Sequence, residues 1–303
     1  MANPRLIKKR VGSIKNIGKI TKALEMVSAS KIQKAQSKAL SAKPYAGAIY
    51  EMIANLSYDF ESNEIPLMRQ PKFTANDLYV LISTNRGLAG SLNVNLFKKI
   101  ESHIDERGKI NHNFITVGKK GRYFALTNGK LVADLSEEKE RVGVISAITK
   151  IITEGFAEQT YDEVYIAYSD FITAFSQVPS VKKILPVSRN LLEEVSHKKS
   201  LEIVGHEYQN NPDLTQSTVK FYYEPDPISV LNNLLPFYIE IQIAEAIFEA
   251  EASEHSARMI AMKNAYDNAT ELSDGLSLEY NKARQSMITT EINDITVAQS
   301  VLR

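Results

Sequence analysis

The chain has 303 residues, and its 36 lysine and arginine residues balance 36 aspartate and glutamate residues, so the formal net charge is zero. With 44% hydrophobic and 24% charged residues, the composition is that of an ordinary globular protein, and the length allows one large or two ordinary domains. The absence of cysteine excludes disulfides, thiolate metal sites and thiol switches. No apolar run approaches the roughly 20 residues that a membrane-spanning helix needs.

The first 43 residues favour one amphipathic helix. No proline lies between Pro4, which suits a helix start, and Pro44, where we expect the helix to end or bend. Gly12 and Gly18 weaken such a helix by roughly 1 kcal/mol each relative to alanine, and they thin it on one side so that a neighbour can approach closely. The apolar residues recur mostly three or four positions apart, at Ile7, Val11, Ile14, Ile17, Ile20, Leu24, Val27 and Ile32.

The stretch from about Ile228 to Arg303 predicts a second and longer helix. No proline follows Pro236, so the helix from Phe237 onward would be on the order of 100 Å long at about 1.5 Å per residue. A compact domain has no use for such a rod, which indicates a role outside its own domain. Its predicted apolar seam comprises Ala265, Ala269, Leu272, Leu276, Tyr280, Ala283 and Met287, continued one position over by Ile288, Ile292, Ile295 and Ala298.

The two terminal helices carry opposite charge. Residues 1–43 hold eleven basic residues against the single acid Glu25, a net charge of +10. Residues 228–303 hold eleven acidic and five basic residues, a net charge of −6. We therefore expect the two helices to pair as an antiparallel coiled coil in which charge complementarity helps to fix the partner. The positive charge that remains suits acidic surroundings.

The middle of the chain alternates between strand and helix patterns. Strands are predicted at 77–84, 114–117, 163–168 and 180–187, the last of them at a sheet edge, and helices at 94–104, 119–126 and 142–157. This alternation indicates a parallel or mixed sheet with helices on its faces. The polar stretch 191–213 is typical of a loop or linker.

No motif for catalysis or for metal binding stands out. The loop Arg86–Gly90 lies between a strand and a helix, where nucleotide-binding folds hold phosphate. It lacks one glycine of the dinucleotide fingerprint and the lysine of a P-loop, so a tight turn is the favoured interpretation. The five histidines form no H-x-x-x-H pair, and Glu137–Glu138 and Glu193–Glu194 have the pattern of surface charge. We expect no catalytic residue, no cofactor and no metal site.

Nucleic-acid binding is also disfavoured, because the basic helix has no aromatic residue before Tyr45 to stack on a base. The residues alone thus indicate an interaction or mechanical part: an α/β domain with two paired terminal helices.

Six sequence blocks are distributed over nearly the whole chain. They are 19–31 (KITKALEMVSASK), 85–93 (NRGLAGSLN), 223–227 (YEPDP), 252–259 (ASEHSARM), 280–285 (YNKARQ) and 288–295 (ITTEINDI). Together, and in this order, they resemble the gamma subunit of bacterial F-type ATP synthases.

The resemblance implies a rotor shaft. In that family the N- and C-terminal helices form a long antiparallel coiled coil that enters the hexameric head of alpha and beta subunits. A Rossmann-like α/β domain sits on the ring of membrane c subunits and contacts the small epsilon subunit. Nucleotide chemistry belongs to the partner subunits, so no catalytic residue or cofactor is implied here. The corresponding parts of this chain are the N-terminal helix at 1–60, the foot domain at 75–215 and the C-terminal helix at 226–303.

The resemblance also assigns contact residues. Those that would meet the catalytic head are Leu24, Met26, Lys31, Arg284, Gln285 and Glu291. Tyr223 and Glu224 would meet the ring and the epsilon subunit. For Leu24 and Met26, packing between the two helices is an equally good interpretation. For Arg284 and Glu291 the alternative is a solvated or intrahelical ion pair worth at most about 0.5 kcal/mol.

Departures from the family pattern are few. Val297-Ala298-Gln299 stands where the family usually has a glycine, which favours a helical tip. The absence of cysteine excludes the redox control of plastid members. The resemblance starts within the first few residues, which leaves no room for a presequence and points to a bacterial protein on the cytoplasmic side of the cell membrane, associated with it through partners. The alternatives are a coiled-coil adaptor unrelated to energy conversion and a nucleotide-binding enzyme that uses the loop at Gly87–Gly90.

Overall fold

The computed structural model describes residues 4–56, 65–71, 73–108, 110–138, 141–188 and 224–301. The chain divides into two compact units, each described by itself below: residues 1–31 with 255–303, called the shaft unit, and residues 32–254, called the sheet unit. Two long helices, α1 (Pro4–Leu56) and α6 (Pro227–Val301), contribute to both units. The remaining helices of the described chain are α2 (Leu92–Arg107), α3 (Gly121–Asn128), α4 (Ile145–Ala157) and the short 3-10 turns η1 (Pro66–Met68) and η2 (Arg141–Val144).

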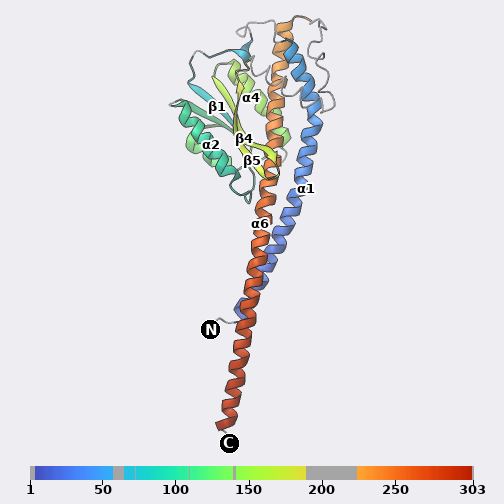
Figure 1. Cartoon of the computed structure of the whole chain (residues 1–303). Coiled ribbons are helices and arrows are strands. Elements are labelled where there is room, and N and C mark those ends of the chain that lie inside the picture. The colour runs from blue at the N-terminus through green and yellow to red at the C-terminus, as the bar shows by residue number, and fades with distance from the viewer. Residues whose placement is uncertain are drawn as a thin grey trace. The chain divides into compact units, whose positions relative to one another are not determined.

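The sheet unit is built on one five-stranded sheet with the order β3-β2-β1-β4-β5 (Figure 1). Strands β1 to β4 pair in parallel, and β4 and β5 form an antiparallel hairpin that places β5 at one edge. The strands are β1 (Asn76–Ile82), β2 (Asn111–Val117), β3 (Lys130–Asp134), β4 (Glu163–Thr173) and β5 (Ser176–Leu185). The predicted fold class, an α/β domain with a long helix at each end of the chain, is confirmed.

The central strand β1 shows why helices cover both faces of the sheet. Successive side chains of a strand point to opposite faces. Leu78 and Val80 join a core cluster that contains residues of α4, α1 and α6, whereas Tyr79 and Leu81 join a second cluster with residues of α2 and α3. A strand buried on both faces reads as a continuous apolar run, which is the pattern that predicted it.

Strand β3 was not predicted. Its sequence, KLVAD, has three apolar residues between charged ends, and the strand lies at the other edge of the sheet, opposite to β5. A short, half-exposed edge strand leaves a weak signal, because only one neighbour and one face constrain its residues.

We expected the first helix to end or bend at Pro44, but the helix does not end there. Helix α1 continues through Pro44 to Leu56. A proline inside a helix removes a hydrogen bond and costs about 3 kcal/mol. Beyond it, the helix buries five apolar side chains in the core of the sheet unit, and burial of even two or three of them outweighs that cost. These side chains are Ala46, Ile49, Tyr50, Ile53 and Leu56.

We predict that Pro44→Ala stabilises the protein by about 1–2 kcal/mol, because it restores the missing hydrogen bond in a helix that already exists. The gain is smaller than the roughly 3 kcal/mol that a proline costs inside a helix, because the unfolded chain of the Pro44→Ala variant is more flexible than that of the wild type. Urea unfolding followed by circular dichroism measures the change, and Ser41→Ala, at an exposed position one turn earlier, is the control. A lower unfolding midpoint for Pro44→Ala would contradict the continuous helix.

Candidate functional site

Small residues bring the two helices of the shaft unit together. Gly18 of α1 is buried, and a Cβ atom added there would lie 3.7 Å from the Cβ of Ala269 and 3.8 Å from the ring of Tyr266 on α6. Thr21 and Ser273 are buried as well, and the Thr21 hydroxyl donates a 3.0 Å hydrogen bond to the Gly18 carbonyl. The predicted close approach at Gly18 is thereby confirmed. At Gly12 nothing lies within 4 Å, so that glycine serves no close approach.

The predicted apolar seam is partly wrong. Ile7 is buried, but Ile20 and Leu272 are each 60% exposed, and Ile17 and Val27 are each 53% exposed. Because glycine, alanine and hydroxyl side chains let the backbones approach, the larger residues beside them are turned outward. A charge placed at Leu272 would therefore stay in water. The buried face of α1 is marked by its small residues Gly18, Thr21 and Ser28. A search for hydrophobic residues alone does not find this face.

The C-terminal part of α6 extends past the described part of α1. Gly18 lies against Tyr266 and Ala269, so antiparallel pairing puts Pro4 opposite about residue 282. All residues from 284 to 296 are exposed. Among them are Met287, Ile288, Ile292 and Ile295, which form an apolar stripe at roughly helical spacing. This segment offers a free helix with an exposed apolar surface.

The residues assigned to the catalytic head lie mainly on exposed positions of the shaft unit. Met26 is 58% exposed and Leu24 is half-buried, with its carbonyl accepting a hydrogen bond from the Ser28 hydroxyl. Lys31 is exposed as well. The three residues of α6 assigned to this contact, Arg284, Gln285 and Glu291, are all exposed.

Charge contributes to the helix pair at Lys22. The Lys22 ammonium lies 5.2 Å from the centre of the Tyr266 ring on α6 and 3.0 Å from the Glu25 carboxylate on its own helix. The wider charge complementarity between the two helices stays a prediction. Of the residues assigned to the ring and the epsilon subunit, Glu224 is exposed shortly before α6 begins, and Tyr223 lies outside the described residues.

The loop after β1 has the structure of a tight turn. The Asn93 side chain accepts a hydrogen bond from the Thr84 backbone and donates one of 2.7 Å to the Thr84 hydroxyl, which donates in turn to the Arg86 carbonyl. Gly90 has a φ of 58°, which a glycine adopts without strain. These polar groups are used to shape the loop itself. Within the described ranges, no group of three or more His, Asp or Glu side chains could hold a metal ion.

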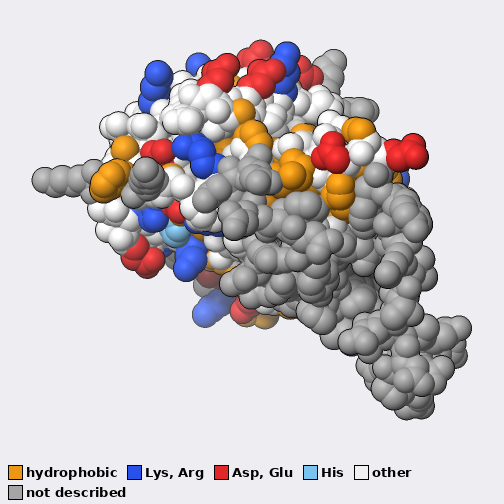
Figure 2. Space-filling model, turned by 90° about the horizontal axis from the view of Figure 1, so that it is seen from above, with side chains coloured by type: hydrophobic (Ala, Val, Ile, Leu, Met, Phe, Trp, Pro, Cys, Tyr) orange, Lys and Arg blue, Asp and Glu red, His pale blue; other side chains and the backbone are white. Residues whose placement is uncertain are grey.

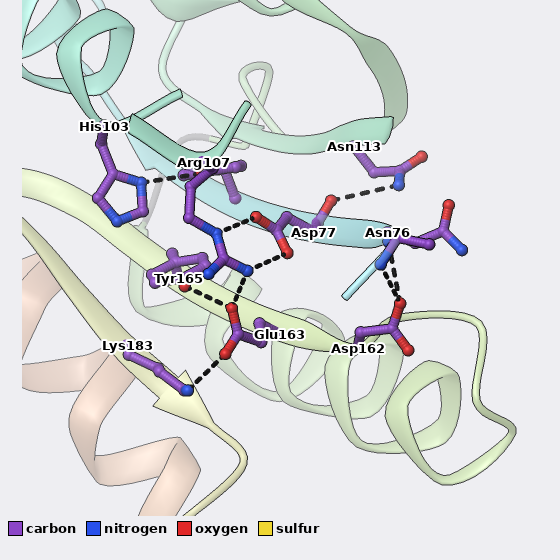
Figure 3. A network of polar contacts seen from close by, with 11 residues as sticks. Asn76, Asp77, His103, Arg107, Asn113, Asp162, Glu163, Tyr165 and Lys183 are labelled. Carbon is purple, nitrogen blue, oxygen red and sulfur yellow. Dashed lines mark hydrogen bonds and ion pairs between the residues drawn. The ribbon is translucent and has the colours of Figure 1, made fainter. Parts of the chain in front are cut away.

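A buried polar network fixes α2 to the sheet (Figure 3). Arg107, at the end of α2, donates hydrogen bonds of 3.1 and 3.2 Å to the fully buried carboxylate of Asp77 on β1 and also bonds Glu163 on β4. Glu163 accepts further hydrogen bonds from Lys183 on β5, at 2.6 Å, and from the Tyr165 hydroxyl, at 2.7 Å. The network spans four elements at the end of the sheet where β1 and β4 begin. Sequence reasoning missed it, since its members lie far apart along the chain.

Burial and ion pairing act against each other in this network. Burial raises the pKa of Asp77 above its ordinary value, although Arg107 opposes the rise. Burial pushes the pKa of Glu163 upward too, but the hydrogen bonds from Lys183 and Tyr165 outweigh it and leave the pKa lowered. Burial lowers the pKa of His103 and of His112, so both rings are neutral at pH 7. The opposite charges in this network balance one another, so its role is structural: it holds α2 against the sheet.

Comparison with known proteins decides the family. The family model described as ATP synthase matches residues 3–302. The ATP synthase gamma chain of Opitutus terrae is 37% identical over 99% of this chain and 98% of its own length. That of Herpetosiphon aurantiacus is 37% identical over 100% and 99%. The chain belongs to the ATP synthase gamma chain family.

Solved structures agree with the gamma chain fold. The structure is similar to a chain of the Euglena gracilis mitochondrial ATP synthase rotor, with a TM-score of 0.57, 19% identity and coverage of 94% of this chain and 98% of that one. It is also similar to a chain of the Tetrahymena thermophila central stalk and c-ring, with a TM-score of 0.55, 23% identity and coverage of 81% and 99%. The family resemblance predicted from the six sequence blocks is confirmed. No helix in the described part of this gamma chain is long and apolar enough to cross a membrane.

Leucine should have opposite effects at Gly18 and Gly12 of α1, because only Gly18 lies in the seam between the two helices. Gly18→Ala should be tolerated, because its Cβ meets Ala269 at an ordinary contact distance and alanine favours helix by about 1 kcal/mol. Gly18→Leu should destabilise the helix pair by about 2 kcal/mol, because the extra atoms meet Tyr266. Gly12→Leu is the matched control and should stabilise the helix by about 0.5–1 kcal/mol. Thermal unfolding measures all three, and equal effects of leucine at both positions would rule out this seam.

The polar network predicts a strong and pH-dependent effect of Arg107→Met. The variant leaves two buried carboxylates without their guanidinium and should lose about 3 kcal/mol near pH 7. Removing Arg107 lets burial raise the pKa of Asp77 further, so the protonated form stabilises the fold at low pH and this stabilisation is lost as pH rises through the folded pKa. The deficit relative to the wild type should therefore shrink between pH 7 and pH 5.

Urea unfolding at several pH values checks this prediction. Arg122→Met is the control, since Arg122 pairs with Asp134 at 3.3 Å while its own side chain is 59% exposed. That change should cost less than about 1 kcal/mol. A deficit for Arg107→Met that stays the same at pH 5 and pH 7 would show that the carboxylates are not responsible.

Proposed function

We propose that this gamma chain is the non-catalytic central shaft of a bacterial, proton-translocating F-type ATP synthase, which couples rotation of the membrane ring to ATP synthesis or hydrolysis in the catalytic head. The observation that carries the proposal is the free end of α6, where Met287, Ile288, Ile292 and Ile295 expose an apolar stripe. A helix of this kind is marginal alone in water and needs an enclosing partner. The similar solved structures are of a mitochondrial ATP synthase rotor and of a central stalk with its c-ring.

The partners at this end are the alpha and beta subunits of the head. The proposed contacts are Leu24, Met26 and Lys31 on α1 and Arg284, Gln285 and Glu291 on α6. The exposure of all but the half-buried Leu24 supports this assignment. Ile17, Ile20 and Leu272, which were predicted to lie in the seam between the helices, are exposed instead. They add to the apolar surface that the shaft unit offers to the head. A smooth apolar surface suits rotation, because it has few directional hydrogen bonds to break as neighbours pass.

The partners at the other end are the ring of c subunits and the epsilon subunit. Tyr223 and Glu224 are the proposed contacts, and exposed Glu224 and Pro225 precede α6. Figure 2 shows hydrophobic side chains together with acidic and basic ones on the face seen from above. We place the protein on the cytoplasmic side of the cell membrane, held there by these partners.

The chain itself is proposed to catalyse no reaction. The polar side chains of the loop at Thr84 and Asn93 are bonded to each other, which disfavours the alternative of a nucleotide-binding enzyme. The adaptor alternative does not account for membership in the gamma chain family. Purified alone, the chain should hydrolyse no ATP, but a head reconstituted from alpha and beta subunits should turn over rapidly only in its presence.

Rotation is tested with one engineered thiol. Lys119 is exposed just before α3, and the chain has no cysteine, so Lys119→Cys provides a unique attachment point for a visible probe. With the head fixed to a surface, ATP should drive the probe in one direction in steps. The reason is that three like catalytic sites around one asymmetric shaft cannot all be satisfied at once.

The matched control places the probe on a head subunit, which should not turn. Random jitter of the shaft probe while ATP is hydrolysed at the normal rate would refute the proposal and favour a static adaptor.

A further inference from the structure

The C-terminal end of α2 is held to the sheet by a histidine as well as by Arg107. The Tyr79 hydroxyl of β1 and the Nδ1 atom of His103 lie 2.9 Å apart, at hydrogen-bond distance. His103 and Arg107 are four residues apart on α2, and Figure 3 shows them side by side. We propose that His103 is an acid-sensitive latch: its neutral ring fastens the end of α2 to β1, and its protonation releases that end. The latch lies within the sheet unit and adds a response to acid that the proposed shaft function does not contain.

The hydrogen bond with Tyr79 requires a neutral histidine. Tyr79 is completely buried, and among the described residues its hydroxyl has no hydrogen-bond partner other than His103. The hydroxyl therefore donates to Nδ1, which leaves the ring proton of His103 on Nε2. A proton added at Nδ1 turns this acceptor into a donor. The hydroxyl proton of Tyr79 is then buried without an acceptor, which is costly.

The surroundings of His103 also disfavour a second positive charge. The centre of its ring lies 4.7 Å from the centre of the Tyr165 ring, and the Arg107 guanidinium lies 5.7 Å from that same centre. The two carboxylates on the sheet, Asp77 and Glu163, already bond Arg107. The charged and titratable groups on the elements around His103 are Lys99, Glu106 and Arg107 of α2, Tyr79 and Asp77 of β1, His112 of β2, Glu163 and Tyr165 of β4 and Lys183 of β5.

His112 of β2 meets the other side of this cluster in the same neutral form. Its ring lies edge to face with the ring of Tyr79, and the two ring centres are 5.8 Å apart. Its Nδ1 atom is buried and has no hydrogen-bond partner in the described structure. A proton on that atom would be a buried donor without an acceptor. Both histidines around Tyr79 are thus accommodated as neutral rings.

The pKa of His103 agrees with this geometry. Burial lowers the pKa, and the charge of Arg107 lowers it further, although Asp77 opposes the shift. A histidine whose pKa is lowered in the folded state contributes stability that is fully present above its unfolded pKa of about 6.5. That stability is lost as the pH falls through 6.5 toward the folded pKa. The latch should thus hold at pH 7 and open as the pH approaches 5.

The first test compares His103→Asn with the full-length wild type in urea unfolding from pH 7 to pH 5. Asparagine offers an oxygen near the position of Nδ1 but takes up no proton. The folding equilibrium constant of the wild type, relative to that of His103→Asn, should fall severalfold over this range. One proton limits the fall to about tenfold per pH unit. The matched control is Ser102→Asn, an asparagine at the exposed neighbouring position of α2, which should follow the wild type.

Amide hydrogen exchange of the same proteins shows where the structure opens. In the wild type, the protection of residues 104–107 at the end of α2, corrected for the intrinsic effect of pH, should fall between pH 7 and pH 5. The protection of α3, on the same face of the sheet, should fall less. In His103→Asn the end of α2 should keep its protection. A stability ratio that is constant from pH 7 to pH 5, or an equal loss of protection in α2 and α3, would overturn the latch.

A titration of the histidine rings by nuclear magnetic resonance keeps the proposal testable even if His103→Asn does not fold. In the wild type, the pKa of His103 should lie below the ordinary value of about 6.5. In Tyr79→Phe it should rise, because the hydrogen bond that holds the neutral ring is gone. A wild-type His103 that titrates at or above 6.5, or a pKa that is unchanged in Tyr79→Phe, would show that Tyr79 does not hold the ring neutral.

Discussion

Burial of the inner ends of α1 and α6 against one face of the sheet is the interaction on which the rest of the sheet unit depends. Ile53 of α1, Leu235 and Ile243 of α6 and Val80 of β1 belong to one core cluster, and each is almost completely buried. Tyr50 and Tyr238 meet edge to face with ring centres 5.6 Å apart, and the Tyr50 hydroxyl accepts a 2.6 Å hydrogen bond from Gln242. The helices are therefore structural members of the domain.

This anchoring explains how one chain reconciles two requirements. A shaft that transmits torque needs its helices fixed at the base, whereas its far end must present a surface that neighbouring subunits can pass. Apolar burial supplies the first, and the Arg107 network holds α2 on the opposite face of the same sheet. The outward-facing residues of the shaft unit supply the second. The seam of small residues meets both requirements. It keeps the two helices in contact while the larger apolar side chains lie on the outer surface.

The two long helices could be predicted because their apolar residues recur regularly over many turns. Most strands could be predicted because they are buried on both faces and therefore read as short apolar runs. It failed where tertiary packing overrides a local signal. Pro44 lies inside a helix because the residues beyond it are buried, and Leu272 faces water because Ala269 and Ser273 occupy the seam. The Arg107 network was not predictable, because contacts between α2, β1 and β4 depend on the topology. The assigned partner contacts rest on the family resemblance, and their exposure agrees with it.

The most direct measurement of the central claim is the structure of the complex that this chain forms, isolated from membranes through a tag on one of its neighbours in the complex and imaged by cryo-electron microscopy. If α6 is the central shaft, residues 284–296 lie inside a ring of six nucleotide-binding subunits, with the apolar stripe at Ile288 and Ile292 against their inner surface. A complex in which this segment lies outside such a ring, or pairs with another long helix in its place, would contradict the assignment of α6 as the central shaft.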